Sequence, residues 1–119
     1  MAALGYKRAL DDFVGRVTDR VGGHIDQILL YGSAARGEYR QGESDVDVLI
    51  ISSSKRVYNT ILDIQTDVNA EYGVALSVLF DSPNEVREEV RAGSSFMREV
   101  LSKGVLLYGN SPRGVEAFA

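Results

Sequence analysis

Cysteine is absent from this 119-residue chain. Its absence excludes disulfide bonds, thiolate zinc sites and cysteine nucleophiles, and it is consistent with a reducing, cytoplasmic setting. Long hydrophobic runs are absent as well, because no apolar stretch approaches the roughly 18–20 residues of a transmembrane helix. The first residues also lack the charged and apolar regions of a signal peptide. We therefore expect a cytoplasmic protein that does not span a membrane.

Basic residues are fewer than acidic ones. The chain has 13 basic and 17 acidic residues, a net charge of −4 and a pI near 4.9. The basic residues are scattered, whereas extended nucleic-acid binding requires a basic face that displaces counterions. A long DNA or RNA partner is therefore not expected. With 45% hydrophobic and 25% charged residues, residues 1–119 are expected to form one ordinary globular domain.

Two aspartates one residue apart begin the second apolar run. In an extended strand Asp45 and Asp47 project from one face, and the alternating apolar residues project from the other. Like charges held together repel each other, and a hard cation such as Mg²⁺ relieves that repulsion while also binding phosphates. The alternative is a polar strand start, solvated or paired with Arg36 or Arg40. For an isolated Asp-x-Asp pair we would prefer that alternative, since such pairs are common by chance.

A possible phosphate-binding turn precedes the aspartates. Gly32 and Ser33 follow an apolar strand and open a short helical stretch from Ala34. Glycine lets a phosphate approach the backbone, Ser33 is expected to cap the helix, and free amides at a helix start attract anions. Arg36 would lie in the first turn, where the macrodipole disfavours a cation by about 0.3–1 kcal/mol unless a phosphate is bound. Each feature alone fits an ordinary turn or surface arginine, but their combination favours a phosphate site.

Three motifs with a fixed spacing extend this interpretation: Gly32-Ser33, then Ala35-Arg36-Gly37, then Ser44-Asp45-Val46-Asp47-Val48-Leu49. Together they resemble the nucleotidyltransferase superfamily of DNA polymerase β type. The resemblance is greatest to its smallest members, the minimal nucleotidyltransferases encoded beside HEPN-domain proteins in bacteria and archaea. Eleven residues separate Ser33 from Asp45, one more than the usual pattern, which indicates a slightly longer loop. A weaker resemblance covers residues 96–109.

This resemblance implies an enzyme that transfers a nucleoside monophosphate from an NTP, taken to be ATP, to an acceptor hydroxyl. Asp45 and Asp47 would be catalytic and hold Mg²⁺ (or Mn²⁺), while Gly32, Ser33 and Arg36 would bind the nucleotide. Such metals clamp the attacking and leaving oxygens of an in-line displacement. Because the domain lacks the second lobe of larger members, the resemblance implies a HEPN-domain partner. The chain would then be an antitoxin that attaches AMP to its toxin. A homo-oligomer stays open.

One part of the family pattern is missing. Active members carry a third carboxylate on the next strand, but the matching strand, Gly73–Phe80, contains no acid. Ser77 is its only polar side chain and a poor ligand for a hard cation, while Asp81 follows the expected strand end. The alternative is therefore a catalytically degenerate module that binds NTP or a HEPN-type partner without chemistry. A two-metal nuclease or phosphatase would use similar carboxylates, but it needs more acids and a basic cleft.

Hydrophobic periodicity predicts an α/β (α+β) fold. A helix is expected over residues 3–21, strands over 25–31 and 45–51, and a helix over 57–72 before the strand with Ser77. Ser82, Pro83 and Glu85 predict a capped helix start, and a second helix and a short strand over 105–108 precede a loose tail. The connections predict a nucleotidyltransferase fold, with a small mixed sheet and helices packed mainly on one face.

Apolar residues near the C-terminus exceed what one side of a small core needs. They are Phe96, Met97, Val100, Leu107, Tyr108 and Phe118. They either form an exposed partner surface or complete the core, and the sequence leaves both interpretations open.

Overall fold

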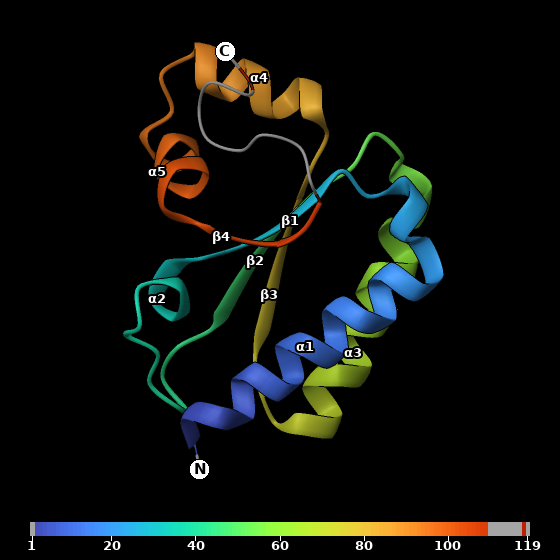
Figure 1. Cartoon of the computed structure of the whole chain (residues 1–119), viewed down its shortest axis with the longest axis vertical. Helices are drawn as coiled ribbons and strands as arrows, with labels where there is room; N and C mark the ends of the chain where they lie inside the picture. The colour runs from blue at the N-terminus through green and yellow to red at the C-terminus, as the bar shows by residue number, and fades with distance from the viewer. Residues whose placement is uncertain (1, 110–117, 119) are drawn as a thin grey trace.

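A four-stranded mixed sheet organises the molecule (Figure 1). The computed structural model describes residues 2–109 and 118. The strands are β1 (Gln27–Tyr31), β2 (Val46–Ile51), β3 (Leu76–Asp81) and β4 (Val105–Tyr108), in the order β3-β2-β1-β4. β1 is antiparallel to β2 and to β4, whereas β2 and β3 are parallel. The predicted mixed sheet and its short last strand are therefore confirmed.

Helices cover both faces of this sheet (Figure 1). α1 (Ala2–Val21) and α3 (Tyr58–Tyr72) pack on one face, while α4 (Pro83–Arg91) and α5 (Ser95–Lys103) pack on the other. The single turn α2 (Gly32–Ala35) follows β1. The two long helices share a face, as expected from the sequence, but the second helical layer was not predicted. It forms because β1 and β2 carry buried apolar side chains on both faces, so both faces require a cover.

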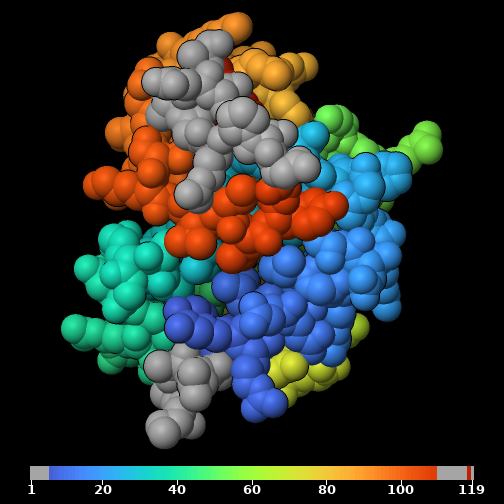
Figure 2. Space-filling model, in the orientation of Figure 1, coloured from blue at the N-terminus to red at the C-terminus, as the bar shows by residue number. Residues whose placement is uncertain are grey.

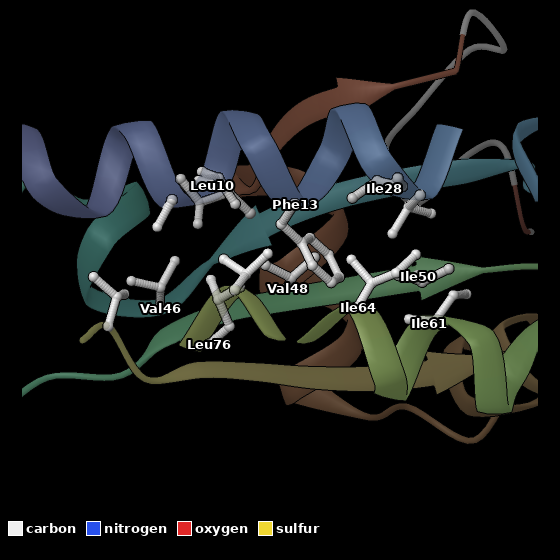
Figure 3. Close-up of a cluster of buried hydrophobic side chains, with 14 of the residues drawn as sticks. Leu10, Phe13, Ile28, Val46, Val48, Ile50, Ile61, Ile64 and Leu76 are labelled. Carbon is white, nitrogen blue, oxygen red and sulfur yellow. The ribbon is translucent and has the colours of Figure 1, made fainter. Parts of the chain in front are cut away.

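The larger core lies between the α1–α3 layer and the sheet (Figure 3). Alternation along β2 directs Val46, Val48 and Ile50 to this side, as predicted. They are fully buried together with Phe13 of α1 and Ile61 of α3. Burying a side chain of this size stabilises the fold by about 1.5–3 kcal/mol. This core holds β2 in place, and Asp47 of β2 therefore projects from the opposite face.

The smaller core lies on that opposite face, under α4 and α5. Leu29, Leu49 and Ile51 are buried there against apolar side chains of the two helices and the C-terminal Phe118. Most of the C-terminal apolar residues thus complete the core or are partly buried against it. Phe96 is the exception, because 46% of it is exposed.

The helices of this second layer begin at defined caps. The Glu85 backbone N–H donates to Ser82 Oγ at 3.1 Å, and the Ser82 N–H donates to Glu85 Oε1 at 2.9 Å, which confirms the predicted capping box. Ser94 Oγ likewise accepts from the Met97 N–H at 3.1 Å. Such caps typically contribute about 1 kcal/mol each. The Ser94 cap fixes the start of α5, a helix that lines the site described below.

The strand boundaries differ from the sequence prediction by one to three residues at several ends, and β1 begins at Gln27 and β3 at Leu76. β2 begins at Val46, so Asp45 lies immediately before it. β3 extends to Asp81, because Asp81 pairs with Ile51 in the parallel ladder. The expected tail after Gly109 lies outside the described residues, apart from Phe118. In the described ranges, no helix is long and apolar enough to cross a membrane.

Candidate active site

The glycine turn after β1 lies directly against an acidic residue of β2. Tyr31 at the end of β1 pairs with Asp47 in the antiparallel ladder. Gly32 follows with a φ of 76°, a left-handed conformation that favours glycine. A Cβ at this position would also clash with Asp47 Oδ2. The close approach of the turn to the carboxylate therefore requires glycine.

The structure corrects the local roles predicted for Ser33 and Arg36. α2 begins at Gly32, so Tyr31 is its N-cap residue, and Ser33 lies inside the turn without capping it. α2 is four residues long and Arg36 is its C-cap. The expected cost of a cation in the first helical turn therefore does not arise. Arg36 Nε instead donates to Glu38 Oε1 at 2.9 Å, a half-exposed ion pair.

Asp45 and Asp47 lie close enough to interact. Asp45 is exposed just before β2, whereas Asp47 is half-buried. Burial raises the pKa of Asp47, the Asp45 carboxylate raises it further, and Arg36 opposes this increase. Partial desolvation and a like charge both penalise an ionised carboxylate. A cation bound here would relieve both penalties, so the two oxygen donors fit Mg²⁺, which takes one or two carboxylates plus substrate phosphates.

The position beside Asp47 on the next strand is occupied by serine. Ser77 of β3 pairs with Asp47 in the parallel ladder, on the strand for which the family resemblance implies a third carboxylate. Within the described part of the chain, no three or more acids, histidines or cysteines are grouped so as to hold a metal. The acids of the preceding helix, Asp63, Asp67 and Glu71, are exposed on α3. The acid set at this site therefore has two members.

Asp81 lies four residues further along β3, opposite Ile51. It is 8% exposed, and its Oδ2 atom has no hydrogen-bond partner in the structure. Burial and the carboxylates of Glu89 and Glu85 on α4 raise the pKa of Asp81 to about 6. Since residues of a strand rise about 3.3 Å each, Asp81 belongs to the α4 end of the sheet. Ser77 is the nearer of the two candidate positions to Asp47.

A cavity of about 270 Å³ lies beside Asp47, between the α2 region and α5. In Figures 1 and 2 the α2 region adjoins the α5 region, although the two are far apart in sequence. The lining from the first half of the chain includes Gly32, Arg36 and Asp47. The structure thus brings three of the predicted site residues to one cavity. Ser33 and Asp45 lie next to these residues in the chain but outside the lining.

One face of α5 supplies the other wall, which sequence reasoning did not predict. Phe96, Glu99, Val100 and Lys103 line the cavity. Their i, i+3, i+4, i+7 spacing is that of one helical face, and this was the signal available in the sequence. Phe96 packs edge-to-face against Tyr31, with the ring centroids 5.5 Å apart. The cavity wall therefore contains an aromatic pair as well as charged side chains.

The chain belongs to the family described as polymerase beta nucleotidyltransferase, whose profile matches residues 20–113. The matched range includes all four strands and all three motifs of the sequence analysis.

Individual relatives are similar over most of the chain. A candidate protein adenylyltransferase of Methanocaldococcus jannaschii is 32% identical over 105 residues, which are 88% of this chain and 100% of that protein. A toxin–antitoxin crystal structure with AMP-PNP matches at a TM-score of 0.60 and 15% identity, over 89% of this chain and 77% of the other. The structure of a variant of the toxin–antitoxin pair MntA–HpeT matches at a TM-score of 0.60 and 14% identity, over 91% of this chain and 78% of the other. At these identities the structures establish a shared fold.

Proposed function

We propose that this protein transfers AMP from ATP to a hydroxyl group of a partner protein, with Mg²⁺ or Mn²⁺ as cofactor. The observation that carries this proposal is the approach of Gly32 to Asp47 at the edge of a cavity that also contains Arg36. A backbone that can approach a phosphate, a carboxylate that attracts a hard cation and a guanidinium are combined there. These are the groups that a triphosphate requires.

Each residue has a defined role in this proposal. The Gly32–Ser33 backbone and Arg36 hold the phosphates, and Asp45 and Asp47 hold the cation. A bound divalent cation neutralises charge on the reacting phosphate and orients it. The acceptor oxygen forms a bond to the α-phosphorus, the bond to pyrophosphate breaks, and the hydroxyl proton is released. Positioning and charge neutralisation supply most of the catalysis in reactions of this type.

The names of the relatives support a protein acceptor. The Methanocaldococcus jannaschii relative is named for protein adenylylation, and two fold neighbours come from toxin–antitoxin assemblies, one with the ATP analogue AMP-PNP. We propose a HEPN-type toxin as the partner and an antitoxin role for this chain. ATP as the substrate is consistent with a cytoplasmic reaction.

The alternative function is nucleotide or partner binding without chemistry. The position of Ser77 beside Asp47 favours it, because a hydroxyl replaces the carboxylate expected there. Both interpretations include nucleotide binding by the glycine turn, Arg36 and the two aspartates. They differ in whether the site can also activate the acceptor hydroxyl.

Incubation with α-labelled ATP and Mg²⁺ distinguishes these functions. The purified protein is tested alone and with extract of its source cells, and both protein-bound label and released pyrophosphate are measured. Adenylyl transfer predicts a labelled protein and pyrophosphate, both lost in Asp45→Ala. ATP binding without label would favour the binding module, and release of inorganic phosphate would instead indicate hydrolysis.

A further inference from the structure

The face of α5 that lines the cavity is rigidly positioned. Met97 and Leu101 lie on the adjacent flank of the helix and are buried in the smaller core, at 0% and 2% exposure. Ser94 caps the N-terminal end. Because the helix is fixed at its start and along its buried flank, the side chains at positions 99 and 103 extend toward the cavity from a defined backbone.

The two cations that line the cavity differ in their surroundings. Arg36 forms an ion pair with Glu38, and the charges of Glu99 and Asp47 also act on it. Lys103, on the opposite wall, is exposed and forms no ion pair with any residue that the structure describes. Arg36 therefore already has an acidic partner within the protein, whereas Lys103 has none among the described residues.

The negative charge in the cavity makes this difference important. Asp47 and Glu99 both line it, and a nucleoside triphosphate would add several more negative charges. Negative charges gathered in one cavity repel each other unless cations lie between them. A cation at Asp47 and the partly neutralised Arg36 act from one wall, which leaves the phosphates facing α5 without a counter-charge other than Lys103.

We infer that Lys103 binds the terminal phosphates of the nucleotide and thereby selects triphosphates over monophosphates. This inference rests on the proposed function, since it names the part of the same substrate that α5 contacts. A lysine ammonium is a compact point charge with three donors on a flexible stem, so it can follow a phosphate that changes position during transfer. The phosphate chain would lie between the glycine turn and α5.

A purely structural role for Lys103 is the competing explanation. It lies in the last turn of α5, where a cation interacts favourably with the helix macrodipole. That role affects stability alone, whereas phosphate binding depends on the number of phosphates and on salt. The two explanations are therefore separable by measurement.

Calorimetric titration of the full chain with ATP, ADP and AMP, each with Mg²⁺, tests the inference. Lys103→Ala is expected to raise the Kd for ATP by about tenfold or more, to raise that for ADP less, and to leave that for AMP unchanged. The loss should shrink at high salt, and Lys103→Arg should retain most of the affinity. Lys55→Ala is the matched control, because Lys55 is an exposed lysine beyond the far end of β2.

The outcomes separate this inference from the proposed function. If the wild type binds ATP and Lys103→Ala binds it equally well, or loses equal affinity for ATP and AMP, the inference about Lys103 is wrong and the nucleotide site stands. If the wild type binds no nucleotide, the proposed function fails and the inference fails with it. Thermal unfolding of each variant shows whether a loss of binding reflects a loss of fold.

Discussion

Two groups of charged residues on this protein are arranged in opposite ways. On the outer side of α1 and α3, Arg16 donates to both oxygens of Asp12 at 3.0 Å and to Glu71 Oε2 at 2.6 Å. The Tyr72 hydroxyl donates to Asp12 Oδ2 at 2.7 Å. At the cavity, by contrast, Asp45 and Asp47 lie near each other, and the structure gives neither carboxylate an ion pair with a described residue.

The pKa values of Asp12 and Asp47 shift in opposite directions as a result. The hydrogen bond from Tyr72 and the pairing with Arg16 lower the pKa of Asp12, while burial and Asp45 raise the pKa of Asp47. A lowered carboxylate pKa marks a charge that the fold has compensated, and a raised one marks a charge left uncompensated. The first group connects two helices, and the second is suited to an external cation and its nucleotide.

The largest effect is expected from removing both uncompensated acids. Asp45→Ala with Asp47→Ala should lower nucleotidyl transfer by about a thousandfold or more and abolish Mg²⁺-dependent ATP binding. The fold should persist, because neither side chain contributes to a core. Circular dichroism and labelled-ATP transfer measure the two properties. Unfolding of the double variant would contradict the assignment of these acids to a site.

A change at Asp81 extends the comparison to an acid whose pKa is raised but which lies away from the cavity. The pKa of Asp81 in the folded protein, about 6, exceeds the ordinary value of 3.8, so the native state binds the carboxyl proton of Asp81 more tightly than the unfolded state does. The contribution to stability is therefore complete below about pH 4 and is lost as pH rises to about 6, by roughly 3 kcal/mol in total.

Asp81→Asn should remove this pH dependence. The variant should be more stable than the wild type at pH 8 by up to about 3 kcal/mol and nearly equal at pH 4. Urea unfolding at pH 4, 6 and 8 measures the difference. A variant destabilised at all three values would indicate that the carboxylate is stabilised by a contact after all.

Replacing Ser77 by aspartate would add a third carboxylate to the two-acid site. If Ser77 occupies the position of the missing carboxylate, Ser77→Asp should increase Mg²⁺-dependent transfer by at least about tenfold. Ser77→Asn is the control, because it adds similar volume without the charge. An equal response of the two variants would direct attention away from this position.

The smallest effect is expected in the compensated group. Arg16→Ala should raise the pKa of Asp12 toward its ordinary value and lower thermal stability slightly, since exposed ion pairs contribute little. The loss should be smaller in high salt. Transfer activity should stay at the wild-type level, and any large drop in it would show that the two groups are coupled.

Much of the fold could be predicted from the sequence because its signals are local. Alternation along residues 46–50 placed the valines and Asp47 on opposite faces, and the Ser82–Glu85 pattern defined the start of α4. The layer formed by α4 and α5 was missed because short apolar strands do not reveal that both faces are buried. The limits of β3 were missed because ladder pairing with β2, not periodicity, brings Asp81 into the strand.

The cavity could be predicted only in part. The sequence predicted that Gly32, Arg36 and Asp47 belong to one nucleotide site, since only a short loop separates them. The α5 wall begins at Phe96, 49 residues beyond Asp47, and only tertiary packing places Glu99 and Lys103 opposite the glycine turn. Arg36 is a C-cap because α2 is only four residues long. So short a helix has no periodic pattern from which its length could be predicted.

The most direct measurement is a carboxyl NMR titration of the aspartates with Mg²⁺ and AMP-PNP. We expect the signals of Asp45 and Asp47 to shift together and the pKa of Asp47 to fall as the cation compensates its charge. Asp12, already compensated by Arg16 and Tyr72, should not respond. Unchanged signals of Asp45 and Asp47, or an equal response of Asp12, would contradict a cation and nucleotide site at this end of β2.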